Sequence, residues 1–151
     1  PGEVFVHRNV ANVIHYSDMT MLSALDFALD ALKNREIIVC GHNGCGGVKA
    51  ATEDLPHGLA DHWLEPSRRL ARAYAVDLAQ HGDEEARRDK LAELNVVEGV
   101  RRVAETPIVQ RAWQDRLSIR VHGLIYGLKD GRLRDLDCTV GPGHFQAEAA
   151  Q

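Results

Sequence analysis

Continuous and alternating runs of apolar residues along the chain predict four strands. The runs at residues 4–6 and 37–40 have no polar interruption, which is typical of buried strands. The second run is rich in β-branched residues and predicts a central strand covered on both faces. Apolar and polar residues alternate over 118–125, and a last strand is expected near 133–140.

Apolar residues at helical spacing predict helices between these strands. Met21 and Leu25 lie on the apolar face of a helix predicted at 20–33, and Ser17 and Asp18 precede it as candidate capping residues. Further helices are predicted at 48–53, over the stretch 56–80, around 91–104 and at 107–113, the last opened by Thr106 as N-cap and Pro107. The charged segment 81–88 is expected to be a surface connection.

The order of these elements implies an α/β fold with a mostly parallel central β-sheet flanked by helices, because parallel strands need crossover connections. The chain has 151 residues, which is the size of one domain, so residues 1–151 are predicted to form a single domain. The tail after Gly141 shows no periodicity and is expected to be frayed.

Composition and charge argue against two classes of partner. Charged residues make up 26% of the chain, and no apolar run approaches the roughly 20 residues that cross a bilayer, so no membrane span is expected. A net charge of −4 without a basic stripe disfavours nucleic acid. Three cysteines, an odd number, form no complete disulfide framework, which favours a reducing, cytoplasmic setting.

The strongest predicted strand ends in a glycine-rich turn that carries His42 and Cys45. Ligands gather at such strand ends in open α/β sheets, and an imidazole nitrogen and a thiolate are donors that zinc prefers. The pair therefore predicts a zinc site. A glycine turn with a buried thiol and a phosphate-binding loop are the alternatives, although no phosphate-loop motif is complete here. Cys40 and Cys45 are too widely spaced for a thioredoxin-like redox pair.

Several separated blocks of sequence carry a resemblance to a known family. They are PGEVFVHRNVAN at 1–12, VCGHNGCGGV at 39–48, ELNVV at 93–97, TPIVQ at 106–110 and VHG at 121–123. Together these blocks resemble the bacterial and fungal type of β-class carbonic anhydrase, over nearly the whole chain. The resemblance implies the β-carbonic anhydrase fold. It also implies zinc-dependent, reversible hydration of carbon dioxide to bicarbonate and a proton, by a homodimer or tetramer.

The resemblance also implies roles for individual residues. It makes His42 and Cys45 two ligands of a Zn²⁺ ion held by a Cys-His-Cys set. It places the backbone N–H of Gly46 against bicarbonate. It assigns to an apolar carbon dioxide pocket the residues Phe5, Val10 and Phe27, although Phe27 stands where the family often has tyrosine. Ordinary core packing is the alternative for these three apolar residues.

One element of the family pattern is absent from the sequence. A Cys-x-Asp-x-Arg motif is expected upstream of Pro1, together with N-terminal helices. By the resemblance it supplies the third zinc ligand and an Asp-Arg pair that orients the zinc-bound water. Cys40 is an alternative third ligand, although the family pattern treats it as structural. Cys138 is expected to be a buried, small apolar residue of the last strand.

The resemblance implies regulation as well. Arg8 and Tyr126 match positions that, in some bacterial members, help form a second, non-catalytic bicarbonate site. A structural ion pair is the alternative for Arg8, and a buried strand aromatic for Tyr126.

Two other functions stay open at this point. One is a degenerate, non-catalytic family member that serves as an interaction module. The other is a related hydrolase of carbon disulfide or carbonyl sulfide on the same scaffold.

Overall fold

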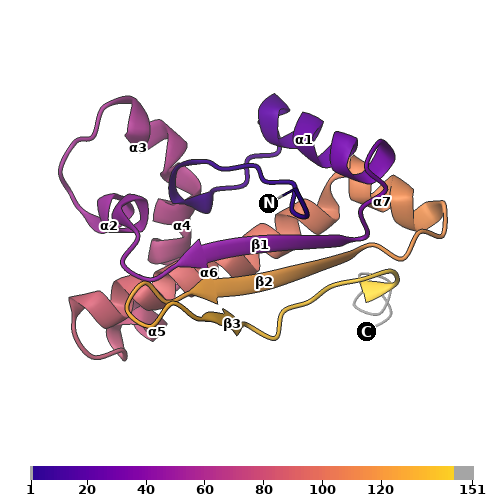
Figure 1. Cartoon of the computed structure of the whole chain (residues 1–151). Helices are drawn as coiled ribbons and strands as arrows, with labels where there is room; N and C mark the ends of the chain where they lie inside the picture. Colours follow the sequence, from indigo (N-terminus) through magenta and orange to yellow (C-terminus); the bar gives the residue numbers. More distant parts are fainter. Residues whose placement is uncertain (1, 145–151) are drawn as a thin grey trace.

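A computed structural model gives the structure of residues 2–144, in which a small sheet has helices packed behind it (Figure 1). The elements, in chain order, are η1 (Val10–Asn12), α1 (Met19–Asp30), β1 (Glu36–His42), α2 (Gly46–Thr52), α3 (Leu59–Trp63), α4 (Glu65–Ala73), α5 (Ala75–Ala79), α6 (Glu84–Glu105), α7 (Pro107–Gln114), β2 (Arg120–Tyr126) and β3 (Leu133–Asp135). This order confirms the predicted α/β fold. The frayed tail predicted after Gly141 falls largely on residues 145–151, which lie outside the described range.

The sheet has the strand order β1-β2-β3. β1 and β2 are parallel and in register from Glu36 opposite Arg120 to His42 opposite Tyr126. β3 pairs with β2 in the antiparallel direction, and it is shorter than the strand predicted at 133–140. After β3 one more backbone hydrogen bond joins the N–H of Leu136 to the carbonyl oxygen of Gly123, and the backbone then returns to β2 at an isolated bridge between Val140 and Val121. The last predicted strand is therefore interrupted and antiparallel.

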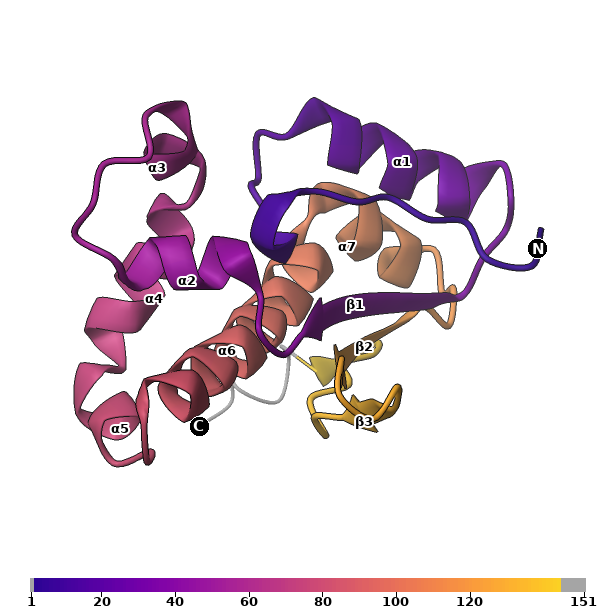
Figure 2. The ribbon, with the colours of Figure 1, turned by 60° about the vertical axis from the view of Figure 1, so that its left-hand side comes forward.

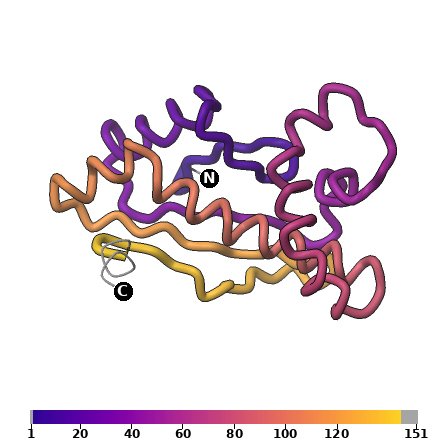
Figure 3. The backbone as a smooth tube through the Cα atoms, turned by 180° about the vertical axis from the view of Figure 1, so that it is seen from behind, coloured from indigo at the N-terminus to yellow at the C-terminus, as the bar shows by residue number. Residues whose placement is uncertain are grey.

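Helix α6 covers one face of the sheet, and Figure 3, which views the molecule from behind, shows it crossing in front of β1 and β2. Val39, Val121 and Ile125 are buried on this face. Gly41 allows the close approach, because a Cβ built on it would lie 2.6 Å from Cγ2 of Val96 on α6. The buried stripe of α6 confirms the amphipathic helix predicted around 91–104.

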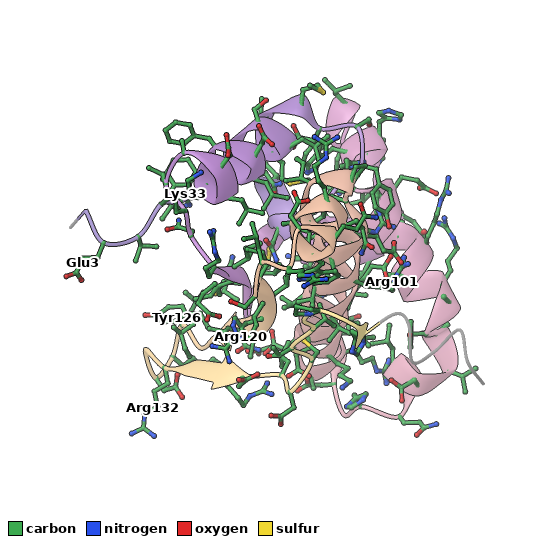
Figure 4. All side chains as sticks on the ribbon, turned by 90° about the vertical axis from the view of Figure 1, so that its right-hand side faces the viewer. Glu3, Lys33, Arg101, Arg120, Tyr126 and Arg132 are labelled. Atoms are coloured by element: carbon green, nitrogen blue, oxygen red, sulfur yellow. The ribbon has the colours of Figure 1, made fainter. Side chains whose placement is uncertain are left out.

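The opposite face of the sheet is open in the described chain. Figure 1 shows no helix in front of the strands, and Figure 4 places Arg120 and Tyr126 on the side away from Arg101 of α6. Ile38 is 57% exposed and Cys40 is also exposed on this face. The prediction of a strand covered on both faces is wrong here. An apolar run indicates that a strand is suited to burial on both faces. It does not indicate which helix or subunit packs against each face.

The predicted strand at 4–6 is also wrong for the described chain. Val4, Phe5 and Val6 are extended but unpaired, with 76%, 46% and 63% of their surface exposed. Figure 2 shows this segment running alongside β1, whose outer edge has no hydrogen-bonded neighbour among the described strands. A strand is stabilised by its ladder partner, so apolar residues alone do not form one.

The starts of α7 and α6 show where local capping residues were enough to predict a helix end and where they were overlooked. The side chain of Thr106 accepts the N–H of Val109, which confirms the predicted N-cap of α7. The connection predicted at 81–88 is wrong beyond Asp83, because Asp83 caps α6 by accepting the N–H of Ala86 at 2.9 Å. The acidic residues that follow belong to the first turn of α6, where the positive end of the helix favours them.

Two apolar clusters hold the described chain together. The main cluster joins α1, β1, α6, α7 and β2. A smaller one contains Ala11, Val13, Ala51 and Leu64, and so joins η1 and α2 to the end of α3. Within the described residues, no helix is both long and apolar enough to cross a membrane. The smaller cluster lies beside the start of α2, where the predicted site is located.

Candidate metal centre

The predicted metal ligands lie at the two ends of one short turn between β1 and α2. His42 is the last residue of β1, and Cys45 immediately precedes α2. Gly44 between them has a φ of 65°, in the left-handed region that glycine adopts without strain. The N–H of Asn43 donates to the carbonyl oxygen of Tyr126 at 3.0 Å, so the end of β2 anchors the turn.

The side chains of this turn have the chemistry of zinc donors. Nδ1 of His42 lies 2.8 Å from the carbonyl oxygen of Asn43. Because a carbonyl oxygen only accepts, Nδ1 carries the proton in this bond and Nε2 keeps a free lone pair. The free thiol of Cys45 is half-buried between the two apolar clusters and makes no capping hydrogen bond to α2. The pair fits Zn²⁺, which binds imidazole and thiolate.

The described residues do not complete a zinc site. No group of three or more His, Cys, Asp or Glu side chains able to hold a metal occurs among residues 2–144. Cys40 therefore does not join His42 and Cys45 in one metal-binding group. It lies on the open face of β1, where its thiol is 3.4 Å from the carbonyl oxygen of Gly41, and partial burial raises its pKa. Cys138 is half-buried against the main cluster, and burial raises the pKa of its thiol as well.

The residues predicted to contact substrate come from different elements of the fold. Gly46 is the first residue of α2, and a Cβ built on it would meet no atom within 4 Å. The rings of Phe5 and Phe27 lie 5.8 Å apart, so the structure brings these two residues together from the N-terminal segment and α1. Val10 lies on η1 and is 61% exposed. Within the described chain these apolar side chains are therefore at the surface and do not enclose a pocket.

The two residues predicted to form a regulatory bicarbonate site are not joined in this structure. Arg8 is exposed on the N-terminal segment, and no hydrogen bond or ion pair links it to Tyr126 among the described residues. Tyr126 ends β2 on the open face, and its hydroxyl lies 3.7 Å from the position of a Cβ on Gly131. The regulatory site stays a prediction.

A shallow hollow of about 350 Å³ lies elsewhere, between residues 54–56 and α4. Arg68 and Arg72 line it, but they pair with Asp61 and Glu65 at 2.6 and 2.8 Å. None of the residues that line this hollow belongs to the turn at residues 42–45, which is called the metal turn below. Apart from Asp54, the charged side chains that line the hollow are paired with one another, which is typical of a structural ion-pair network.

Sequence reasoning missed the residues that hold η1 beside the metal turn. Nδ2 of Asn95 donates to the carbonyl oxygen of Ala11 at 2.8 Å, and its Oδ1 accepts the hydroxyl of Ser67 at 2.9 Å. Nε1 of Trp63 donates to the carbonyl oxygen of Val10 at 2.8 Å. An isolated asparagine on the apolar stripe of α6 was the available signal, because a buried polar group needs partners.

Replacement of Asn95 by alanine is expected to destabilise the protein by about 2–4 kcal/mol, because it leaves the Ala11 carbonyl and the Ser67 hydroxyl buried without partners. Urea unfolding of the full-length protein measures this loss. The double variant with Ser67→Ala should lose less than the sum of the two single losses, because the variants share one network. A loss below about 0.5 kcal/mol for Asn95→Ala would show that the network is not needed.

Comparison of the sequence with known proteins gives one consistent family. Residues 1–133 match the family described as carbonic anhydrase. The chain is 41% identical over 136 residues to a carbonic anhydrase of Emericella nidulans, covering 90% of this chain and 60% of that protein. It is 37% identical to one of Candida albicans, covering 91% of this chain and 49% of that protein. The chain thus spans about half to three-fifths of the length of these relatives.

Comparison of the structure agrees with the sequence. A tetrameric β-carbonic anhydrase of Sordaria macrospora superimposes with a TM-score of 0.87 at 34% identity, covering 93% of this chain and 71% of that one. A β-carbonic anhydrase of Aspergillus fumigatus gives 0.87 at 39% identity, covering 99% of this chain and 71% of that one. The chain therefore belongs to the carbonic anhydrase family and, within it, to the β class.

Proposed function

We propose that the complete protein catalyses the zinc-dependent, reversible hydration of carbon dioxide to bicarbonate and a proton. The observation that carries this proposal is the turn that presents Nε2 of His42 and the thiol of Cys45, in a chain of the carbonic anhydrase family. Zn²⁺, when bound, supplies a Lewis acid that lowers the pKa of water to about 7. These two side chains would hold it, together with one further protein ligand.

The third ligand is proposed to come from a Cys-x-Asp-x-Arg segment that precedes Pro1 in the complete protein. Two observations support this proposal. The outer edge of β1 has no strand partner among the described strands, and the extended segment at 4–6 runs alongside it unpaired. An additional parallel strand at this edge would end beside His42, because the carboxyl ends of parallel strands lie at the same edge of a sheet.

The residues of this chain would bind and shield the substrate. Gly46 is exposed at the first position of α2, where a backbone N–H has no acceptor within the helix, so this N–H would suit a bicarbonate oxygen. Phe5 and Phe27 pack ring against ring, and their apolar surfaces favour carbon dioxide over water. The hydrogen bond from Nδ1–H of His42 to Asn43 fixes the orientation of the imidazole, as partners of metal-bound histidines generally do.

Stopped-flow measurement of carbon dioxide hydration by the full-length protein, with its zinc content, tests the proposed function. We expect about one zinc per subunit and hydration that stops when a chelator removes the metal. A folded protein without zinc and without activity would instead be a non-catalytic family member. Parallel assays with carbonyl sulfide and carbon disulfide test the related-hydrolase alternative. A preference for either substrate would make the protein a hydrolase of that substrate.

A homo-oligomer is proposed as the working form, as a dimer or a tetramer. The open face of the sheet supports this, since it exposes Ile38, Leu133 and Tyr126 by 57%, 59% and 37%. Apolar patches of this kind are typical of subunit contacts. Light scattering of the full-length protein measures its mass in solution, and a monomer at micromolar concentration would contradict the proposal.

A cytoplasmic location is also proposed, because the cysteines of the described chain are free thiols. Fractionation of the source cells tests it, and recovery of the protein outside the cytoplasm would contradict it.

A further inference from the structure

The metal turn is held by two other elements of the fold. Only Asn43 and Gly44 separate His42 from Cys45, and the backbone N–H of each is taken up by another element. The N–H of Asn43 donates to a backbone carbonyl at the end of β2. The N–H of Gly44 donates to Oδ1 of Asp89 on α6, at 2.8 Å. Figure 2 shows the turn beside α6.

The hydrogen bond to Asp89 depends on the identity of one side chain. The other hydrogen bonds of the turn are accepted by backbone carbonyl groups. The carbonyl groups of Tyr126 and Asn43, which accept the remaining bonds of the turn, would be present with any residue at those positions. Asp89 supplies a carboxylate from a position 45 residues away in the sequence. A backbone N–H bound to a carboxylate is a charge-assisted hydrogen bond and is stronger than a neutral one. Gly44 itself is exposed and needs such a restraint to hold one conformation.

Asp89 has no role in starting its own helix. The N-cap of α6 is Asp83, and the acidic residues of its first turn are Glu84 and Glu85. Glu85 pairs with Lys129 at 2.7 Å. The half-buried carboxylate of Asp89 is thus directed to the turn, whereas its acidic neighbours serve the helix and its surface.

We propose that Asp89 is a positioning residue for the metal site. By holding the N–H of Gly44, it keeps His42 and Cys45 at the separation at which both donors reach one ion. The inference rests on the proposed zinc function, because the turn needs this restraint only if its two ends share a metal. Groups outside the ligand set that orient the ligands commonly affect metal affinity by about 10–100-fold.

Three variants of the full-length protein test the proposal through zinc affinity, measured by competition with a chelator. Asp89→Ala removes the acceptor and is expected to weaken zinc binding by about 10–100-fold. Asp89→Asn keeps an acceptor oxygen at the same position and should restore the affinity to within about threefold of the wild type. Glu85→Ala removes a carboxylate one turn earlier on the same helix and should leave the affinity unchanged.

A second measurement does not require metal. Amide hydrogen exchange of the zinc-free protein should be at least about tenfold faster at Gly44 in Asp89→Ala, with the amides of α6 unchanged and the effect reversed in Asp89→Asn. Wild-type zinc affinity and unchanged Gly44 exchange in Asp89→Ala would overturn the role of Asp89 alone. A folded wild-type protein that binds no zinc would overturn the proposed function, and this inference with it.

Discussion

Replacement of Cys45 by alanine in the full-length protein is expected to abolish zinc binding and to slow carbon dioxide hydration by at least about a thousandfold. Catalytic zinc sites have three protein ligands, so a site with one thiolate fewer does not retain the metal at ordinary concentrations. Without the metal, the pKa of water rises from about 7 back to its far higher value in bulk water, and almost no hydroxide is available near neutral pH. Metal analysis and stopped-flow assays of the same sample measure both effects.

Cys138→Ala is the matched control, because it also removes a half-buried thiol that packs against the main cluster. Its zinc content and activity should equal those of the wild type. His42→Ala should behave like Cys45→Ala, because His42 supplies the other donor from the same turn. Full zinc content in both the Cys45 and the His42 variants would refute the assigned ligands.

Replacement of Gly47 by alanine is expected to destabilise the protein by about 2–3 kcal/mol or more, through overpacking. A Cβ at this position would lie 2.6 Å from the Cβ of Ala11 and 3.2 Å from its backbone nitrogen. Ala11 cannot yield easily, because Asn95 holds its carbonyl oxygen and its φ is 59°. Urea unfolding of the full-length variant measures the free energy of unfolding.

Gly46→Ala provides the control at the neighbouring position of the same helix. A Cβ on Gly46 would meet no atom within 4 Å, so only helix propensity changes, and it favours alanine by up to about 1 kcal/mol. The Gly46 variant should therefore be as stable as the wild type or slightly more stable. Equal stability of the Gly46 and Gly47 variants would mean that the packing of η1 on α2 does not constrain this glycine.

Several parts of the fold follow from short stretches of sequence. The N-cap at Thr106 with the proline after it predicted the start of α7, and the structure confirms it. The β-branched run before His42 predicted β1, although its extent is Glu36–His42. The turn between His42 and Cys45 was likewise visible as a glycine-rich segment at the end of a strand. These features depend on residues within a few positions of one another, which a sequence displays directly.

Other parts depended on distant partners. The segment at 4–6 has the composition of a strand but lacks a hydrogen-bonded neighbour, so it is merely extended. β3 was placed nearly correctly, but its antiparallel direction and its early end depend on how the backbone returns to β2. The N-cap at Asp83 differs from these cases, because its signal was local. It was missed because Asp83 lies in a charged segment that was interpreted as a surface connection.

The sequence by itself determined most of the elements, the family resemblance and the turn that carries the two predicted donors, because periodicity, capping and glycine spacing act over a few residues. Only the tertiary structure decided which residues support that turn. Asn95 reaches Ala11 across 84 positions, and Asp89 reaches Gly44 across 45. A polar side chain on α6 could form hydrogen bonds with many backbone groups of the chain. Only the packing of α6 against the sheet decides which of these groups lie within reach.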